Sequence, residues 1–140
     1  MATRQARNFT KRYQEMVYDA DINTINDSVR VLARGKYHNF PFVILNVRGS
    51  HPTAYFGIGK EHTFYGSDYG DVPLDVHGGL TYSDNHVPKS SIKDKWWLGW
   101  DYAHVGDRMG YYPNVTRDKA WTREEILAEV KQAISDFEKL

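Results

Sequence analysis

Apolar positions in the middle of the chain form short runs separated by turn residues. The segment PFVILNV at 41–47 is continuously apolar and β-branched, and TAYFGI at 53–58 follows after the turn residues 48–52. Two such runs around a short turn are typical of a β-hairpin. Two later segments, DVHGGLTYS at 75–83 and KWWLGWDY at 95–102, have the composition of strands that carry glycines. The pattern therefore predicts four strands.

The C-terminal segment has the periodicity of an amphipathic helix. Thr122 and Glu125 match a capping box, in which each side chain bonds to the backbone N–H of the other residue. Apolar residues then recur at helical spacing: Ile126, Leu127, Val130, Ile134 and Phe137. We expect a helix over 123–139 that packs on the sheet.

The N-terminal third has weaker patterns. Residues 1–12 hold basic and no acidic side chains, which predicts a flexible basic arm. The stretch 13–20 is interpreted as a helix. A second short helix is expected over 24–34, because Gly35 follows as a stop signal and three apolar residues recur near helical spacing: Ile25, Val29 and Leu32.

Together these elements predict an α+β fold, with a mainly antiparallel sheet of about four or more strands and helices packed on one face. The chain has 140 residues and no repeat or linker, so we expect one domain over 1–140. At this length a domain buries roughly 68–70% of the surface of its unfolded chain, which is enough for a core without disulfides or structural metal.

Composition excludes several classes of function. The chain has no Cys, which removes thiolate zinc sites, thiol catalysis and disulfides. Its 18 Lys and Arg balance 18 Asp and Glu, which argues against a broad basic surface for duplex nucleic acid. The sequence contains neither an apolar run near the roughly 18 residues of a membrane span nor an apolar signal-peptide core. We expect a soluble, cytoplasmic protein without a membrane partner.

Aromatic content is high, with 4 Trp, 10 Tyr and 6 Phe. Such rings fill the core of small β-rich domains, or they offer flat faces on which a base can stack. Both interpretations stay open at this point.

Alternation along the third and fourth expected strands sorts the side chains onto two faces. The polar face of 75–83 holds His77, Gly79, Thr81 and Ser83. In 95–102, one face holds Trp97, Gly99 and Asp101, and the other holds Trp96, Leu98 and Trp100. If the latter set packs the core and the strands are neighbours in register, four side chains line one surface: His77, Thr81, Trp97 and Asp101. A ring, two hydrogen-bonding groups and a carboxylate suit a small polar ligand with a flat group.

A metal site is an alternative for the same region. Asp101, His104 and Asp107 are spaced three and three, and His77 could join them from the neighbouring strand. Oxygen and imidazole ligands hold divalent metals. Because short Asp and His spacings often arise by chance, ligand binding without metal and structural hydrogen bonding stay open beside it.

Other motifs carry less weight. The segment 51–53 is a single His-x-Thr, an element that two-histidine phosphoesterases use twice, so His51 is expected to be a turn residue. The sequence has no phosphate-binding loop and no nucleophile elbow. Four arginines could pair with phosphate: Arg48, Arg108, Arg117 and Arg123.

The blocks HGGLTYS at 77–83 and WWLGWDYAHVGD at 96–107 resemble the signature of a family of small phage and prophage proteins of uncharacterised function. The resemblance covers roughly residues 41 to 135 and includes HPTAYFGI and the WTREEI helix start. It implies a viral setting, in which small cysteine-free proteins often counter host defence. Some of these proteins are sponges that withhold cyclic nucleotides or ADP-ribose-type immune signals from host effectors.

Our leading hypothesis is a non-enzymatic binder of such a nucleotide-derived signal. A ring from Trp97, Tyr82 or Trp100 stacks on the base. Asp101 and Thr81 bond to sugar or base edges, and the phosphate meets one of three side chains: His77, His104 or Arg108. We expect a homo-oligomer that closes its pocket between subunits, with no cofactor. The arm at 1–12 or the loop from Gly59 to Val72 would supply a cover.

Two alternatives belong to other classes. One is a metal-dependent phosphodiesterase that degrades these signals, with an activated water held by Asp101, His104, Asp107 and His77. The other is an inhibitor that docks on a host defence protein through an exposed aromatic patch.

Overall fold

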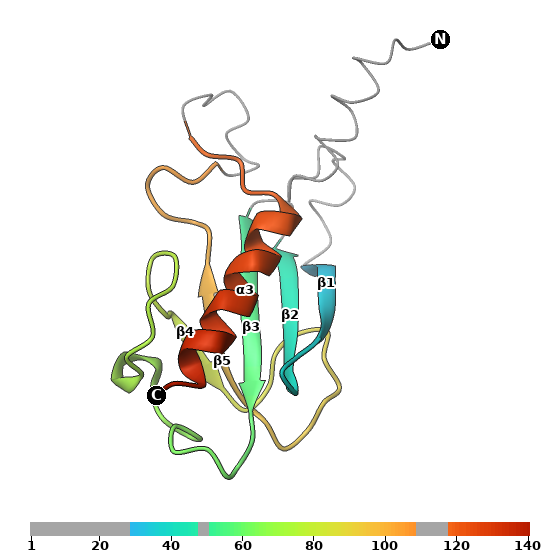
Figure 1. Ribbon diagram of the computed structural model, residues 1–140. Helices are drawn as coiled ribbons and strands as arrows, with labels where there is room; N and C mark the ends of the chain where they lie inside the picture. The colour runs from blue at the N-terminus through green and yellow to red at the C-terminus, as the bar shows by residue number, and fades with distance from the viewer. Residues whose placement is uncertain (1–28, 48–50, 109–117) are drawn as a thin grey trace.

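Five strands form one antiparallel sheet in the order β1-β2-β3-β5-β4 (Figure 1). The structure is a computed structural model that describes residues 29–47, 51–108 and 118–140. The strands are β1 (Val29–Tyr37), β2 (Phe40–Val47), β3 (His51–Ile58), β4 (Tyr82–Asp84) and β5 (Trp96–Asp101). A 3-10 turn, η1 (Tyr69–Asp71), and the helix α3 (Arg123–Phe137) complete the described elements. The expected antiparallel sheet and C-terminal helix are confirmed. The arm predicted over 1–12 and the helix predicted over 13–20 lie outside the described residues.

Helix α3 packs against one face of the sheet, as Figure 1 shows. Its first turn is closed by the predicted capping box, in which Thr122 Oγ1 accepts from the Glu125 backbone N–H at 3.2 Å. Glu125 Oε1 accepts from the Thr122 backbone N–H at 3.0 Å in return. The helix buries five side chains in the main core: Ile126, Val130, Ala133, Ile134 and Phe137. Sheet residues that include Ile44, Phe56 and Trp100 meet them.

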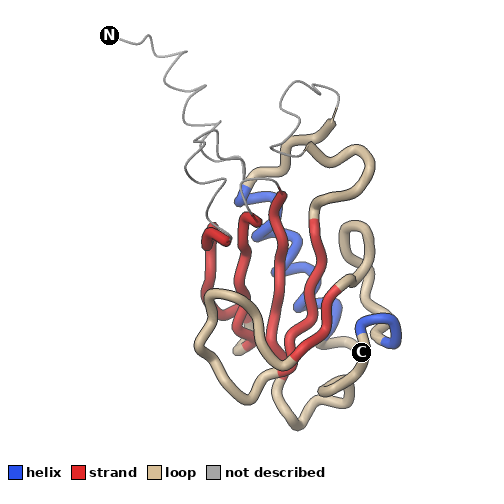
Figure 2. Tube along the Cα trace, turned by 180° about the vertical axis from the view of Figure 1, so that it is seen from behind, coloured by secondary structure: helices blue, strands red, loops and turns tan. Residues whose placement is uncertain are grey.

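The opposite face of the sheet is covered by the loop 85–95, between β4 and β5 (Figure 2). Val87 from this loop packs in a second apolar cluster with Val43, Leu45, Tyr55 and Trp97. The central strands β2 and β3 are therefore buried on both faces. This explains why β2 has a continuous apolar run instead of an alternating pattern.

The helix expected over 24–34 is wrong where the structure describes it, because residues 29–34 belong to β1. This strand pairs with β2 from Val29↔Val47 to Tyr37↔Phe40. His38 and Asn39 connect the two strands with φ of 48° and 69°, the left-handed conformation that a tight two-residue hairpin needs. Pairing with the apolar β2 overrides the helical spacing of a few residues, which is a weak signal.

The strand expected over 75–83 is also largely wrong, because only Tyr82 and Ser83 lie in β4. Gly78 and Gly79 have φ of 69° and 81°, so the chain turns there and cannot continue as a strand. Upstream of the turn, the loop buries apolar side chains at every second position: Val72, Leu74 and Val76. The alternation of polar and apolar residues before the turn therefore reflects a loop that packs on the core, not a strand.

In the described part of the chain, no helix is long and apolar enough to span a membrane.

Candidate functional site

Polar side chains gather at the end of the sheet where β5 ends and α3 begins, at the top of Figure 1. At their centre is Asp107, which is only 4% exposed. Its carboxylate accepts from Nε2 of His77 at 2.7 Å, from the backbone N–H of His104 at 3.0 Å and from Nε1 of Trp121 at 2.8 Å. A buried carboxylate needs such donors, because removal from water is otherwise costly. The chain around Asp107 is held by a parallel bridge to Lys119.

His77 is held between two aromatic rings. The Tyr102 ring is stacked on the imidazole at a centroid distance of 4.8 Å and an angle of 9°. The Trp121 ring lies 4.8 Å away at 59°. When Nε2–H of a neutral imidazole donates to a carboxylate, Nδ1 is left with the lone pair. The pair His77 and Asp107 is therefore an oriented imidazole, and the His77 side chain stays 24% exposed.

The Glu129 carboxylate, on α3, helps to fix the position of His77. Its Oε2 accepts from the backbone N–H of His77 at 3.1 Å, and its Oε1 accepts from Nε1 of Trp100 at 3.2 Å and from the Tyr102 hydroxyl. Burial, followed by the hydrogen bond to Glu129, raises the pKa of Tyr102. The phenol therefore remains a hydrogen-bond donor at any ordinary pH.

A second histidine and carboxylate lie beside the first pair. Asp101 accepts from Oγ1 of Thr81 at 3.1 Å and from the backbone N–H of Ala103 at 3.1 Å. Its Oδ1 also lies 3.0 Å from Nε2 of His104. The alignment there is not that of a hydrogen bond, and this buried nitrogen has no hydrogen-bond partner. The contact between His104 and Asp101 is therefore electrostatic, and it leaves hydrogen-bonding capacity unused.

The two pairs form one cluster. The rings of His77 and His104 are 5.6 Å apart at 72°. Gly78 lies against the His104 imidazole, where a Cβ atom would overlap it. The strand pairing expected from the sequence is present only next to the cluster, where Tyr82 of β4 pairs with Gly99 of β5 and Thr81 N–H donates to the Gly99 carbonyl at 2.9 Å. The structure thus brings together five of the predicted side chains: His77, Thr81, Asp101, His104 and Asp107.

His51, expected to be a turn residue, begins β3 at the same end of the sheet. Burial lowers its pKa, Asp101 acts in the opposite direction, and His104 lowers it further. A third imidazole therefore feels the charges of the cluster, although the His-x-Thr motif alone did not predict this.

The predicted stacking rings lie elsewhere. Trp97 is 0% exposed and packs on the face covered by the loop 85–95, whereas Trp100 is 1% exposed beneath α3. Tyr82 packs edge-on against Tyr55 at 5.1 Å and donates its hydroxyl to the carbonyl of His86. None of the three presents a face to the cluster. The partly buried ring that does lie there is Trp121.

Arg108 follows Asp107 directly. Its backbone N–H donates to the carbonyl of Lys119 at 2.8 Å, which keeps this arginine close to the cluster. Lys119 Nζ lies 4.0 Å over the Trp121 ring, a cation–π contact, and 2.8 Å from Glu125 Oε2. The cationic side chain of Lys119 therefore borders the cluster at Trp121.

Metal binding gains no support from these distances. Within 29–47, 51–108 and 118–140, no group of three or more His, Asp or Glu side chains has an arrangement that could hold a metal ion. Asp107 already accepts three hydrogen bonds. The three-and-three spacing of Asp101, His104 and Asp107 instead serves two separate carboxylate–histidine pairs.

Three members of the cluster were missed by sequence reasoning: Tyr102, Trp121 and Glu129. Glu129 had a readable signal, because it lies three residues after Ile126 and four before Ala133, within the buried row of the helix. A carboxylate in such a row requires polar partners. Trp121 and Tyr102 carried no comparable signal, since aromatic residues are common throughout the chain.

No protein-family model, curated protein or solved structure matches this chain.

Proposed function

We propose that the protein binds the phosphate group of a nucleotide-derived ligand at the two carboxylate–histidine pairs and holds the ligand without cleaving it. The observation that carries this proposal is the separation of 5.6 Å between the rings of His77 and His104. Their side chains are 24% and 36% exposed, and because Nε2 of His77 is bound to Asp107 and Nε2 of His104 is buried, a ligand would meet the Nδ1 edge of each ring. A histidine that carries a second proton donates from both ring nitrogens, and charge-assisted bonds to phosphate oxygens are the strong ones.

The groups around the two histidines fit the rest of such a ligand. The exposed Thr81 supplies a hydroxyl, and Trp121 supplies a ring beside His77. Lys119 adds a cation beside Trp121, and Arg108 is held next to Asp107 through its backbone. Trp121 replaces Trp97, Trp100 and Tyr82 as the proposed contact for the base.

The biological setting follows from the resemblance to phage proteins. The two blocks that carry this resemblance, 77–83 and 96–107, contain all five predicted members of the cluster. In a phage-type protein the ligand would be an immune signal, either a cyclic nucleotide or an ADP-ribose-like molecule, sequestered in the host cytoplasm. A homo-oligomer would exclude water from the bound phosphate. Exclusion of water strengthens the polar contacts between the protein and the phosphate.

A second candidate function is metal-free cleavage of the same phosphodiester. The orientation of His77 by Asp107 favours it, because a carboxylate-oriented imidazole is the usual general base. His77 would take a proton from water as the water oxygen bonds to phosphorus. His104 would give a proton to the leaving oxygen as its bond to phosphorus breaks.

The two functions are separated by one experiment. Purified protein is mixed with a panel of cyclic nucleotides and cyclised ADP-ribose species, with and without a divalent metal or a chelator. After removal of free ligand and heat denaturation, the released molecules are identified by mass spectrometry. Intact release supports sequestration, whereas chelator-insensitive fragments support the second candidate. If no species is depleted, both are wrong and a protein partner becomes the better hypothesis.

Variants locate the activity in the cluster. We expect Thr81→Val and the double substitution His77→Asn with His104→Asn to reduce depletion about tenfold or more, since each removes charge-assisted or hydroxyl donors. His38→Asn is the matched control, because the His38 side chain is 49% exposed and lies in the turn between β1 and β2, outside the cluster. Equal depletion by all variants would remove the site assignment.

A further inference from the structure

A second hollow lies where the loop 85–95 meets β1 and β2. Its volume is about 360 Å³, and its cationic lining residues are Arg34, Lys36 and Lys89. No acidic residue is among the side chains that line it in the described structure. Phe42 and Val43 contribute buried apolar surface, and Ile92 contributes a side chain that is 42% exposed. The hollow therefore combines positive charge with an apolar surface.

The loop that forms this hollow is fixed in place. Nη1 of Arg34 donates to the carbonyl of Lys89 at 3.3 Å, which ties the loop to β1. Lys89 and Asp94 have φ of 64° and 61°, a conformation that costs non-glycine residues free energy. Val87 anchors the start of the loop in the second apolar cluster. The backbone that carries Lys89 is therefore held in a defined position next to Arg34.

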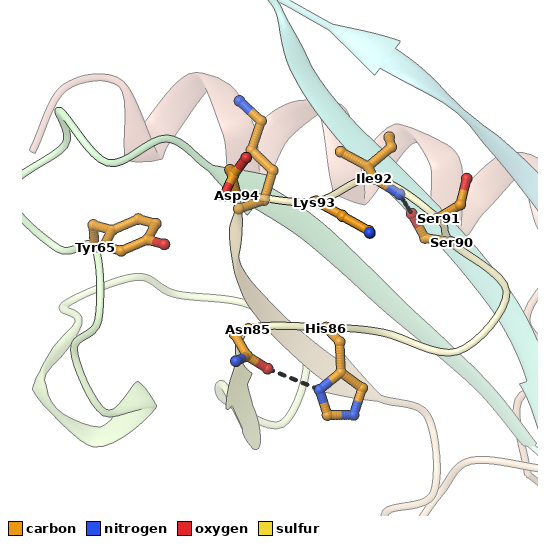
Figure 3. Close-up of a pocket in the computed structure, with 9 residues that line it drawn as sticks. Tyr65, Asn85, His86, Ser90, Ser91, Ile92, Lys93 and Asp94 are labelled. Carbon is orange, nitrogen blue, oxygen red and sulfur yellow. Dashed lines mark hydrogen bonds between the residues drawn. The ribbon is translucent and has the colours of Figure 1, made fainter.

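A larger hollow of about 480 Å³ adjoins the first one across residues 90–92, which line both. Figure 3 shows Lys93 and His86 on facing sides of it. Its one carboxylate, from Asp94, lies 3.5 Å from Lys60 Nζ, so its charge is partly balanced. Positive charge therefore continues beyond the first hollow along the same loop.

We propose that these adjoining hollows bind a phosphate-bearing small molecule of nucleotide size. The phosphates meet Arg34, Lys36 and Lys89, since guanidinium and ammonium groups are the common protein ligands of phosphate. The ring of the ligand packs on Ile92. A cavity of a few hundred Å³ with an apolar wall and a few polar groups is typical of small-molecule sites. This site shares no residue with the histidine cluster.

Isothermal titration of the full chain with ATP, and separately with inorganic tripolyphosphate, tests this proposal. We expect the triple substitution Arg34→Gln, Lys36→Gln and Lys89→Gln to weaken binding of both probes about tenfold or more. Ile92→Ser should weaken ATP binding and leave tripolyphosphate binding unchanged, because only ATP has a ring. The double substitution at His77 and His104 should leave the calorimetric ATP affinity of this site unchanged.

The control removes the same charge from α3 and the residues that follow it through Arg123→Gln, Lys131→Gln and Lys139→Gln. Equal weakening by both triple variants would mean non-specific attraction to net charge and would overturn the proposal. Absence of ATP binding would also overturn it. Binding of a single-stranded oligonucleotide without binding of ATP would contradict the small-molecule class and indicate a polymeric partner. Circular dichroism confirms that each variant is folded before titration.

Discussion

The backbone N–H of His77 donates to Oε2 of Glu129 at 3.1 Å, across 52 positions of sequence. The other oxygen of Glu129 accepts from Trp100 and Tyr102, so one carboxylate joins α3, β5 and the loop that carries His77. Helix α3 therefore does more than cover the core. It fixes the position of the histidine on which the proposed binding depends.

Replacement of Glu129 tests this relationship. Glu129→Leu leaves three donors without an acceptor and should lower the free energy of unfolding by about 2–3 kcal/mol. Glu129→Gln keeps one acceptor oxygen and should cost about half as much. Urea unfolding followed by tryptophan fluorescence measures both. The exposed Glu124→Gln is the control, and a cost for Glu129→Leu no larger than for this control would contradict the assigned role.

Asp107→Asn should affect stability and ligand binding together. Asparagine retains one acceptor for the three donors from His77, His104 and Trp121, and its amide group then faces a donor. We expect a loss of about 2–3 kcal/mol in unfolding free energy, with weaker ligand depletion at temperatures where the variant is folded. Asp75→Asn, an exposed position in the loop that carries His77, should stay within about 0.5 kcal/mol of the parent protein.

The two adjacent glycines of the His77 loop offer a matched comparison. Gly78 and Gly79 both have left-handed φ, but only a Cβ at Gly78 would overlap the His104 ring. Gly79→Ala should cost about 1 kcal/mol from backbone strain alone. Gly78→Ala should cost more and should also reduce ligand depletion, because His104 must move. Thermal unfolding and the depletion assay measure the two effects, and identical behaviour of the variants would argue against close packing at His104.

Two tryptophans should respond differently to substitution. Trp97→Ala removes a ring that is 0% exposed and should cost about 3–5 kcal/mol. Trp121→Phe keeps a ring beside His77 but removes the donor to Asp107, so about 1–2 kcal/mol is expected. The second variant should nevertheless lose more ligand affinity at matched folded fraction. A larger affinity loss from Trp97→Ala than from Trp121→Phe would instead indicate that Trp97 contacts the ligand.

The depressed pKa of His51 predicts how stability depends on pH. Because its folded-state pKa lies below the ordinary 6.5, the unfolded chain binds more protons in the interval between the two values. Its contribution to stability is therefore complete above pH 6.5 and declines as the pH falls from there toward the folded-state pKa. We expect His51→Gln to reduce this decline in urea titrations between pH 7 and 5. The control His86→Gln should not, and a decline unchanged in His51→Gln would exclude a contribution from His51.

Local patterns predicted the elements whose partners are also local. The strands at 41–47 and 53–58 belong to one hairpin, and the cap of α3 is set by Thr122 and Glu125 within one turn. The helix expected over 24–34 failed because β1 is stabilised by pairing with β2, which no spacing within 24–34 reports. From the sequence, Gly78 and Gly79 were interpreted as glycines within a strand, and the turn that they form was not predicted.

For the cluster, the residue types were found but their surroundings were not. His77, Thr81, Asp101, His104 and Asp107 meet, although the strand alternation proposed for 75–83 does not exist. The alternation of side chains along β5 correctly placed Leu98 and Trp100 on the face that meets the helix. The interpretation also assumed that the opposite face of β5 was open to a ligand. Trp97 is buried because Val87 of the loop 85–95 and the strand residues Val43, Leu45 and Tyr55 pack on that face, and the packing with β2 and β3 joins segments that are distant in sequence.

The bridge between Asp107 and Lys119 has a consequence for how this protein can be altered. Two backbone hydrogen bonds of 2.8 Å, from Arg108 N–H to the Lys119 carbonyl and from Lys119 N–H to the Gly106 carbonyl, clamp the chain on both sides of 109–117. Because loop-closure entropy grows slowly with length, doubling that segment costs only about 0.6 kcal/mol. A reporter peptide or a second binding module grafted between the clamped ends would leave Asp107 and Trp121 in place.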